Sequence, residues 1–221
     1  MKLMLLGSSG HAGVIVDAIE ASGQHEILGY LDDTLAANTV KRGYPVMGGF
    51  ADRTHFPGVG LVLAFGDNFS RCKIARNIPD GVFPLIQHPS AVVARSATIA
   101  RGSVLLAGVV VGAGSKVGEF CVLNTRASLD HDSVMSPFSS LGPGTSTGGL
   151  VEIGECSAVG VGVSISDRIR IDAHSVIGTG AVVVRDIPDH VVAYGVPARV
   201  MHSRQEGEGY VGTNPRLQTT H

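Results

Sequence analysis

A six-residue repeat of aliphatic side chains constrains the fold of this chain more than any other feature. Among the sixteen positions at six-residue spacing from Val93 to Val183, every residue is aliphatic except Thr147, and the fourth residue after each is mostly small. An α-helix repeats at about 3.6 residues and a β-strand at about 2, so neither explains a strict six. A hexapeptide parallel β-helix does, because each short strand puts its aliphatic residue in the lumen.

Three hexapeptides close one triangular coil, so residues eighteen apart are expected to stack on one another. Helices of this type wind left-handed, an exception to the usual right-handed crossover. We therefore predict a left-handed parallel β-helix over residues 86–200. The polar tail, 201–221, lacks periodicity and is expected to be flexible.

The first part of the chain, residues 1–85, does not follow the six-residue period. Its apolar patterning instead predicts alternating strands and helices. The expected elements are strands at 2–6, 27–31 and 60–65 and helices at 14–21 and 68–78. A strand, a glycine-rich turn, a helix and a strand form a βαβ unit, so we predict a Rossmann-like α/β domain ahead of the β-helix.

Composition excludes several classes of partner. The net charge is −2 and the isoelectric point about 6.5, so there is no electrostatic basis for nucleic acid binding. No run of eighteen apolar residues predicts a membrane span, and we expect a soluble, cytoplasmic protein. The three cysteines show no C-x-x-C spacing.

The glycine turn after the first strand has the spacing of a phosphate-binding loop. Gly7, Gly10 and Gly13 stand between a strand and a helix, where backbone N–H groups can face an anion. Asp32 and Asp33 follow at the distance where an acidic pair binds ribose hydroxyls. About eighty residues suffice for one mononucleotide-binding half, which favours a nucleotide over NAD. The alternative is a tight turn that binds no ligand.

The most informative polar cluster is Asp130-His131-Asp132, at a predicted edge of the β-helix. A carboxylate beside an imidazole raises its basicity and fixes its tautomer, as a general base requires. Gly149 lies eighteen residues later, so its N–H should lie one coil above His131, where it could stabilise an oxyanion. The alternative is a surface histidine flanked by solubilising acids.

Histidine and cysteine spacing does not favour metal or thiol chemistry. His131 and His174, the histidines within the repeat, are not separated by a multiple of eighteen, and no two histidines there lie within five residues. We therefore expect no metal site. No cysteine neighbours or stacks on His131, which favours direct transfer over a covalent cysteine intermediate.

With these residues in hand, the chain resembles the bacterial nucleotide-sugar N-acetyltransferases of the bacillosamine and perosamine type. It is similar as well to the sialic acid O-acetyltransferases that share their hexapeptide-repeat architecture. The resemblance covers roughly residues 2 to 200. It rests on the segments 7–11, 29–33, 65–68, 124–125, 130–132 and 195–198.

The resemblance implies a homotrimer with acetyl-CoA between neighbouring β-helices and the nucleotide-sugar on the domain 1–85. It assigns His131 as the catalytic base and Asp132 as the adjacent acid. The implied acetyl-CoA contacts are Asn124, Ser140, Gly149, Val161 and Thr179. The implied nucleotide-sugar contacts are Gly7, Ser8, Ser9, Gly10, His11, Asp32, Asp33, Gly66 and Asn68.

The function implied by the resemblance is N-acetylation of a nucleotide-linked amino sugar, a 4-amino-6-deoxyhexose. One position departs from the bacillosamine branch, where a second histidine follows the Phe-Ser pair and this chain has Ser140. Serine donates a hydrogen bond but carries no charge, so the exact branch and sugar stay open. The rival interpretations are an O-acetyltransferase for sialic acid or a related sugar, and a non-catalytic nucleotide sensor or scaffold.

Overall fold

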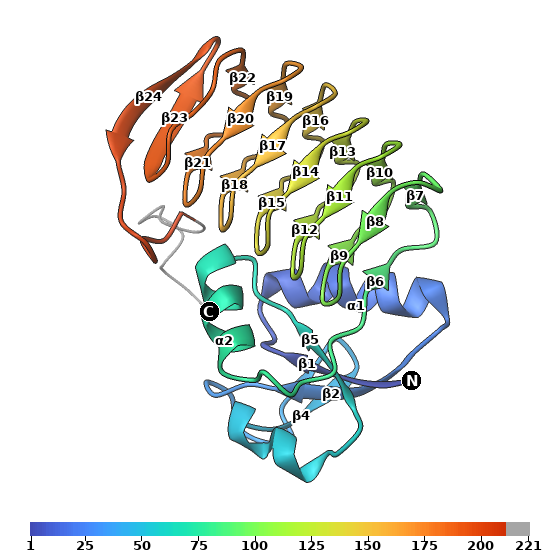
Figure 1. The fold of residues 1–221 in the computed structure, drawn as a ribbon. Helices are drawn as coiled ribbons and strands as arrows, with labels where there is room; N and C mark the ends of the chain where they lie inside the picture. The colour runs from blue at the N-terminus through green and yellow to red at the C-terminus, as the bar shows by residue number, and fades with distance from the viewer. Residues whose placement is uncertain (211–221) are drawn as a thin grey trace.

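The structure, a computed structural model, describes residues 1–210 and consists of an α/β domain beneath a slanted stack of β-coils (Figure 1). The last eleven residues of the predicted tail, 211–221, lie outside the described residues. None of the helices in the described part is long and apolar enough to cross a membrane.

The α/β domain is built on one five-stranded sheet with the order β3-β4-β2-β1-β5. Its strands are β1 (Lys2–Leu6), β2 (Glu26–Leu31), β3 (Val40–Lys41), β4 (Tyr44–Gly48) and β5 (Gly60–Leu63). Strands β2, β1 and β5 run parallel, as the predicted βαβ unit requires, and β1 is buried over Leu3–Leu6. The short hairpin of β3 and β4 and the 3₁₀ helix η1 (Phe50–His55) have no clear apolar period, so the sequence did not predict them.

Two α-helices connect this sheet to the rest of the molecule. Helix α1 (Gly10–Ser22) follows the glycine turn and ends at Gly23, whose left-handed conformation (φ 62°) stops the helix. Helix α2 (Asn68–Arg76) begins at Asp67, whose carboxylate accepts a hydrogen bond from the Ser70 N–H. Both helices therefore begin close to the residues that the sequence marked as ligand contacts.

The β-helix confirms the six-residue prediction strand by strand. It begins at β6 (Ile86–Gln87), and each predicted aliphatic residue ends a two-residue strand with its side chain turned into the lumen. The strands are β7 (Val92–Val93), β8 (Thr98–Ile99), β9 (Val104–Leu105), β10 (Val110–Val111), β11 (Lys116–Val117), β12 (Val122–Leu123), β13 (Ser128–Leu129), β14 (Val134–Met135), β15 (Ser140–Leu141), β16 (Ser146–Thr147), β17 (Glu152–Ile153), β18 (Ala158–Val159), β19 (Ser164–Ile165), β20 (Arg170–Ile171), β21 (Val176–Ile177) and β22 (Val182–Val183).

These strands form the three faces of a left-handed parallel β-helix. We call them the β6 face (the eight-stranded sheet from β6 to β24), the β7 face (the six-stranded sheet from β7 to β22) and the β8 face (the five-stranded sheet from β8 to β20). Strands eighteen residues apart pair in register, as in Leu105↔Leu123↔Leu141. At most corners one residue has a positive φ, which is glycine at some corners and a larger residue such as Asp132 (φ 54°) at others.

The last coil is two residues shorter than the others. Strand β21 pairs with β23 (Val191–Gly195) in the register Val176↔Val192, an offset of sixteen. Strand β23 then turns back into β24 (Ala198–Ser203), its antiparallel partner at the top of the stack (Figure 1).

The chain from residue 201 onward differs from the predicted flexible tail. Strand β24 continues to Ser203, and the following segment returns toward the α/β domain (Figure 1). Arg204, only 8% exposed, donates hydrogen bonds through Nη1 to the His174 carbonyl (2.7 Å) and through its N–H to the His190 carbonyl (2.8 Å). This C-terminal segment is polar in sequence, and hydrogen bonds rather than buried apolar side chains hold it in place.

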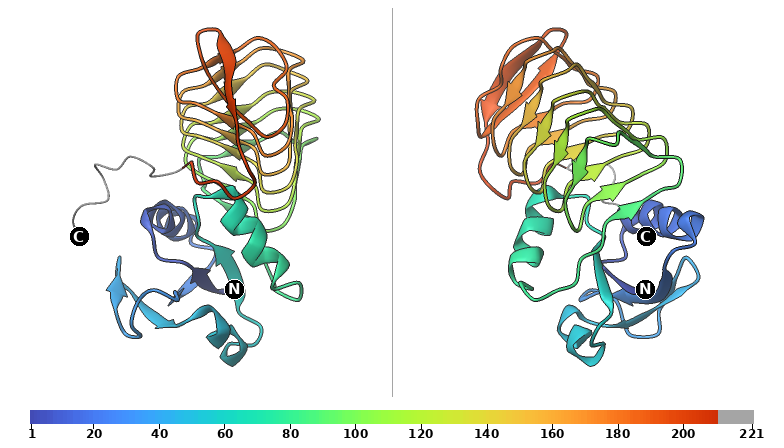
Figure 2. Two further views of the ribbon diagram at one scale, coloured as in Figure 1. Left: turned by 90° about the vertical axis from the view of Figure 1, so that its left-hand side faces the viewer. Right: turned by 45° about the vertical axis from the view of Figure 1, so that its right-hand side comes forward.

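The two parts of the molecule meet along two packed contacts (Figure 2). Helix α1 packs Ile15 and Ile19 against Ile86 and the outward side chains of the β6 face. Helix α2 packs Cys72 and Ala75 against a corner of the β-helix lined by stacked side chains. The corner side chains are Phe120, Phe138 and Cys156.

A buried arginine, Arg71 on α2, joins the two parts at this contact. Its side chain is 2% exposed, and its guanidinium donates to the carbonyls of Phe120 (3.2 Å) and Phe138 (3.2 Å) on successive coils. It also donates to the Phe65 carbonyl (3.0 Å) and to Asn68 Oδ1 (2.7 Å). Burial lowers the pKa of Arg71, but several hydrogen bonds to oxygen compensate the buried charge.

Replacing this arginine tests how much the junction stabilises the fold. We expect Arg71→Leu to lower the free energy of unfolding by about 3–5 kcal/mol, because it leaves several buried oxygens without a donor. Urea denaturation followed by circular dichroism measures the loss. The matched control is Arg95→Leu at an exposed position, where the change should stay within about 0.5 kcal/mol. Equal effects for the two variants would contradict a stabilising role for Arg71.

Candidate active site

A pocket of about 350 Å³ lies where the α/β domain, the β6 face and the C-terminal segment meet. Its floor is the outer surface of the β6 face, with small and branched side chains that leave room above the sheet. The lining residues are His11, Gly66, Val122, Asn124, Ser140, Leu141, Gly142, Pro143, Ala158, Val159, Gly160, Val161, Val176, Ile177, Thr179 and Tyr210.

The pocket brings together residues that the sequence analysis had assigned to two different ligands. His11 and Gly66 were assigned to the nucleotide-sugar, and both lie on its α/β wall. The β-helix wall contains four of the five residues assigned to acetyl-CoA, which are Asn124, Ser140, Val161 and Thr179. The two sets of contacts therefore converge on one cavity.

His11, near the start of α1, is held neutral in this cavity. Burial and, to a smaller extent, the positive charge of Arg71 together lower its pKa to about 4. Its Nε2 is buried and has no hydrogen-bond partner within residues 1–210. A buried polar atom that lines a pocket without a partner is suited to bind a ligand.

Tyr210 closes the pocket from the C-terminal segment, and the sequence analysis missed it. Its hydroxyl accepts a hydrogen bond from the Asn68 N–H (3.2 Å) and donates to the Gly66 carbonyl (3.5 Å). Burial is the main cause that raises its pKa. No local motif marks Tyr210, because its position depends on the return of the chain after β24.

The glycine turn forms as predicted, but its polar groups are partly occupied. Ser8 donates through its N–H (2.9 Å) and its hydroxyl (2.6 Å) to Asp32 Oδ2, and Thr34 does the same to Oδ1 (2.9 and 2.6 Å). Burial alone would raise the pKa of Asp32, but these hydrogen bonds lower it. Ser9 stands at the N-cap of α1 without a side-chain hydrogen bond, and Gly10 has open space around it.

Three residues predicted to contact the nucleotide-sugar, Asp32, Asp33 and Asn68, make hydrogen bonds within the protein. All four acceptor positions of Asp32 are filled by Ser8 and Thr34, so it fixes the turn instead of offering free oxygens. Asp33 accepts the Phe50 N–H (2.7 Å). Asn68 is fully buried, donates to the Ser157 carbonyl (2.9 Å), and thus holds α2 on the β-helix. These roles depend on tertiary contacts that no sequence motif reveals.

His131 lies at the corner between the β7 and β8 faces, with its side chain 55% exposed. Its Nδ1 is 2.9 Å from Asp132 Oδ2, and this hydrogen bond is the main cause that raises the pKa of His131. The charges of Asp130 and Asp167 act in the same direction. Because an ionised carboxylate only accepts, the proton sits on Nδ1, which leaves the Nε2 lone pair available.

The ring of His131 lies against Gly149 on the next coil, as the eighteen-residue spacing predicts. A Cβ at Gly149 would overlap Nε2 and Cε1 of the imidazole, so a larger residue there would displace the His131 ring from its present position. The Gly149 N–H, however, donates to Asp167 Oδ1 at 3.2 Å. An oxyanion at this corner would have to compete with Asp167 for that donor.

Thr147, the one exception in the aliphatic series, explains why the backbone ladder is interrupted just before His131. Its hydroxyl accepts the Asp130 N–H (3.0 Å) from inside the lumen. At the equivalent position one coil below, the Gly112 N–H bonds to the Leu129 backbone carbonyl. Pairing between β13 and β16 is accordingly reduced to Ser128↔Ser146. The threonine thus reshapes the strand that leads into His131.

The His131 corner and the pocket are separated within one chain. Asn124 lies at the corner where the β6 face meets the β7 face, and His131 lies at the other end of the β7 face. Strand β13 runs between the two corners, and His131 does not line the pocket. A reaction that uses both would need them to come together across two chains.

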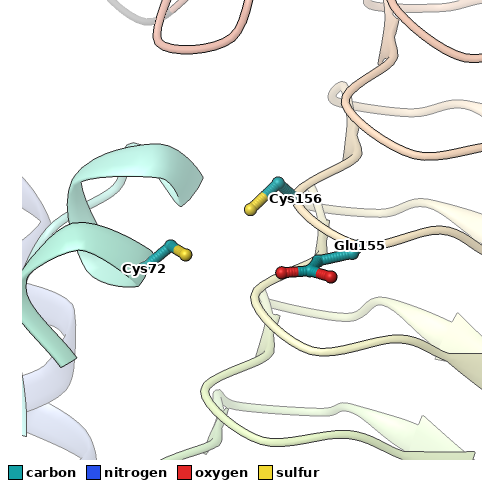
Figure 3. Close-up of side chains that lie close together, drawn as sticks. All are labelled: Cys72, Glu155 and Cys156. Carbon is teal, nitrogen blue, oxygen red and sulfur yellow. The ribbon is translucent and has the colours of Figure 1, made fainter. Parts of the chain in front are cut away.

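The cysteines have the properties of packed thiols rather than nucleophiles. Cys72 on α2 and Cys156 on the β-helix point toward each other across the junction, beside Glu155 (Figure 3). Burial raises the pKa of Cys156 to about 12 and that of Cys121 to about 11, so both stay protonated at neutral pH.

Comparison with known proteins assigns the family. Residues 2–78 match the model of the PglD N-terminal domain. The chain is similar to a histidine-to-alanine variant of GDP-perosamine N-acetyltransferase from Caulobacter crescentus, solved with CoA and GDP-perosamine, at 33% identity and a TM-score of 0.87, over 92% of this chain and 98% of that one. The acetyltransferase domain of PglB from Neisseria gonorrhoeae, in complex with acetyl coenzyme A, is similar at 34% identity and a TM-score of 0.86, over 90% and 98%.

Curated relatives match over shorter stretches. A galactoside O-acetyltransferase from Lactococcus lactis is 50% identical over 42 residues, which are 19% of this chain and 20% of that protein. The stretches matched in such relatives span less than two thirds of their length. The nearly complete overlap with the two solved acetyltransferases is decisive: this chain belongs to the hexapeptide-repeat family of nucleotide-sugar acetyltransferases, acyltransferases that use acetyl-CoA as co-substrate.

Proposed function

We propose that this protein transfers the acetyl group of acetyl-CoA to the amine of a nucleotide-linked 4-amino-6-deoxyhexose. The observation that carries the proposal is the His131 imidazole, oriented by Asp132 through Nδ1 and turned with Nε2 toward Gly149. Such a pair is suited to accept a proton from an attacking nucleophile. A non-catalytic sensor would have no use for this arrangement.

In the proposed reaction the neutral amine attacks the thioester carbonyl carbon. The C–N bond forms, the C–S bond breaks, and the amine proton passes to His131 Nε2. Coenzyme A leaves as a thiolate and takes up a proton from the imidazolium or from water. The Gly149 N–H, released from its 3.2 Å bond to Asp167, would stabilise the carbonyl oxygen as it becomes negative.

The pocket is the proposed place where the two substrates meet. Its β-helix wall, with Asn124, Ser140 and Thr179, would hold the acetyl end of acetyl-CoA. Its α/β wall would hold the sugar, with His11 Nε2 as the polar contact. The nucleotide would extend along the Ser8–Gly10 turn toward the free N-cap of α1. The solved relative with GDP-perosamine supports a sugar of this class.

We further propose a homotrimer in which the His131 corner of one chain faces the pocket of its neighbour. The β7 face lies between the two corners, so a chain packed there would bring them together. Its outward side chains carry no charge, as in the core of protein interfaces. They are Val92, Val110, Ser128, Ser146, Ser164 and Val182. The β8 face, in contrast, exposes Lys116, Glu152 and Arg170.

A thiol-release assay with acetyl-CoA tests the proposed function directly. We expect release with one of the GDP-, UDP- or dTDP-linked 4-amino-6-deoxyhexoses, because the proposed base takes the proton of an attacking sugar amine. His131→Ala should lower turnover by about 10²–10⁴-fold and leave coenzyme binding largely unchanged. Release with sialic acid or a galactoside alone would contradict the proposed N-acetylation and indicate O-acetylation. No release with any acceptor, together with nucleotide binding, would favour the sensor.

The pH dependence of kcat/KM tests whether Asp132 raises the pKa of the catalytic base His131. A base must be deprotonated to act, so the rate falls as the pH drops through the raised pKa of His131. Asp132→Asn removes the main cause of that shift, and we expect the acidic limb of kcat/KM to move to lower pH with a reduced plateau. Asp130→Asn is the comparison variant, because its carboxylate bonds the His131 N–H (2.7 Å) and raises the pKa of the ring only through its charge, so the acidic limb should move less than in Asp132→Asn. An unmoved limb in Asp132→Asn would rule out His131 as the titrating base.

Mixing two inactive variants tests whether the active site is shared between chains. His131→Ala lacks the base, and Ser140→Trp fills the pocket. If each active site takes its base from one chain and its pocket from the next, refolded 1:1 mixtures should regain activity. In a random mixture about one interface in four combines an intact His131 with an intact pocket, so we expect up to about a quarter of the wild-type activity. Absence of any regain in mixed trimers, verified by mass, would place both halves in one chain.

A further inference from the structure

We propose that His174, His190 and Glu206 form a binding site for a divalent transition metal, with Zn²⁺ the best fit, at the C-terminal end of the β-helix. Their ligand atoms all lie within 4.8 Å of one another. Glu206 Oε1 is 3.3 Å from His174 Nε2 and 3.7 Å from His190 Nε2. Two imidazole nitrogens thus converge on one carboxylate oxygen.

These distances are close to those between the ligands of a tetrahedral zinc ion. With Zn–N and Zn–O bonds of about 2.0–2.2 Å, neighbouring ligand atoms are about 3.3–3.5 Å apart. The two rings stack with their centroids 4.9 Å apart and their planes at 23°, and both Nε2 atoms lie near Glu206 Oε1. Small side-chain rotations would suffice to place an ion between them. The donor set of two histidines and one glutamate is one that zinc uses in proteins.

A second carboxylate orients one of the ligands. Asp189 Oδ2 is 3.2 Å from His190 Nδ1, so the carboxylate can accept the Nδ1 proton and leave the Nε2 lone pair for a metal. The side chain of His174 is only 17% exposed, whereas that of Glu206 is 55% exposed. The open side would leave room for water as a fourth ligand.

The short last coil brings the two histidines together. His174 and His190 both occupy corner positions with a positive φ (56° and 53°) and are sixteen residues apart. The His190 N–H donates to the Ala173 carbonyl (3.1 Å), which stacks the corners. The histidine spacing predicted no metal, because no two histidines of the repeat lie within five residues or a multiple of eighteen apart, whereas this coil stacks residues sixteen apart.

The third ligand arrives on the segment that also closes the pocket. Arg204 bonds the carbonyls of both His174 and His190, and this fixes the chain just before Glu206. Four residues further on, Tyr210 lines the pocket. A metal at Glu206 would therefore hold the C-terminal segment in the position that places Tyr210 over the substrates. The metal site stands on its own geometry and does not depend on the proposed function.

A second group of potential ligands, Cys72, Cys156 and Glu155, is less suited to a metal. Arg76 Nη2 donates to Glu155 Oε1 at 2.8 Å, so this carboxylate already has a cationic partner. The two thiols are buried among apolar side chains. This group supplies a matched control, because it is the other such set among residues 1–210.

Metal titration of the full chain tests the proposal. After treatment with EDTA, the wild-type protein should bind one Zn²⁺ per chain in competition with a chromophoric chelator, and Co²⁺ should give the visible absorption bands of a four-coordinate site. Asp189→Asn should weaken binding by about 10-fold or more, and His174→Ala, His190→Ala and Glu206→Gln should weaken it further. Zinc should also slow hydrogen exchange in residues 204–210 of the wild type alone.

The control variants decide where the metal binds. Cys72→Ser and His131→Ala should keep one zinc of wild-type affinity, and circular dichroism should verify that every variant is folded. Stoichiometric zinc that survives in His174→Ala and His190→Ala, or that is lost in Cys72→Ser, would overturn the proposal. So would a wild-type protein that binds zinc no tighter than His190→Ala. None of these readouts depends on acetyl transfer.

Discussion

The buried guanidinium of Arg71 is the interaction on which the rest of the structure depends. It donates to carbonyls on two successive coils and to oxygens at the start of α2, so it fixes the α/β domain against one corner of the β-helix. The pocket exists only because of this placement, since His11 and Gly66 come from one side and Ser140 from the other. The same charge also lowers the pKa of His11, which links the stability of the junction to the chemistry of the cavity.

Within the β-helix, the regular repeat forms the apolar core, and its two exceptions place polar groups at particular corners. Where the period is strict, aliphatic side chains fill the lumen and the ladder of backbone hydrogen bonds is regular. Thr147 breaks the apolar series and replaces one ladder bond directly before His131. The sixteen-residue coil breaks the spacing and stacks His174 on His190. Both departures introduce polar groups at defined corners, where a strictly regular solenoid would offer only a uniform surface.

The sequence predicted whatever depends on local pattern, and it could not predict what depends on distant segments. Strand β1 has its predicted bounds at Lys2–Leu6, and the aliphatic positions follow the period because the coil turns every sixth side chain into the lumen. The contact of His131 with Gly149 also follows from the spacing. Asp32 and Asn68 have the residue types of ligand contacts, yet tertiary hydrogen bonds occupy them. Tyr210 has no motif at all, because a return of the chain over a long distance places it.

The opposite environments of His11 and His131 indicate which of the two binds the substrate and which is the base in the proposed active site. His11 is buried near Arg71, and its low pKa keeps it neutral, so it can exchange hydrogen bonds with a substrate but does not take up a second proton at neutral pH. His131 is exposed beside carboxylates, and its raised pKa makes it the better proton acceptor. Titratable groups whose surroundings push their pKa values apart identify the acid–base group of a site. Because His11 lies in the pocket wall on α1 and His131 lies at a β-helix corner outside the pocket, the proposed reaction would combine them through a neighbouring β-helix, with the binding histidine from one chain and the base from the next.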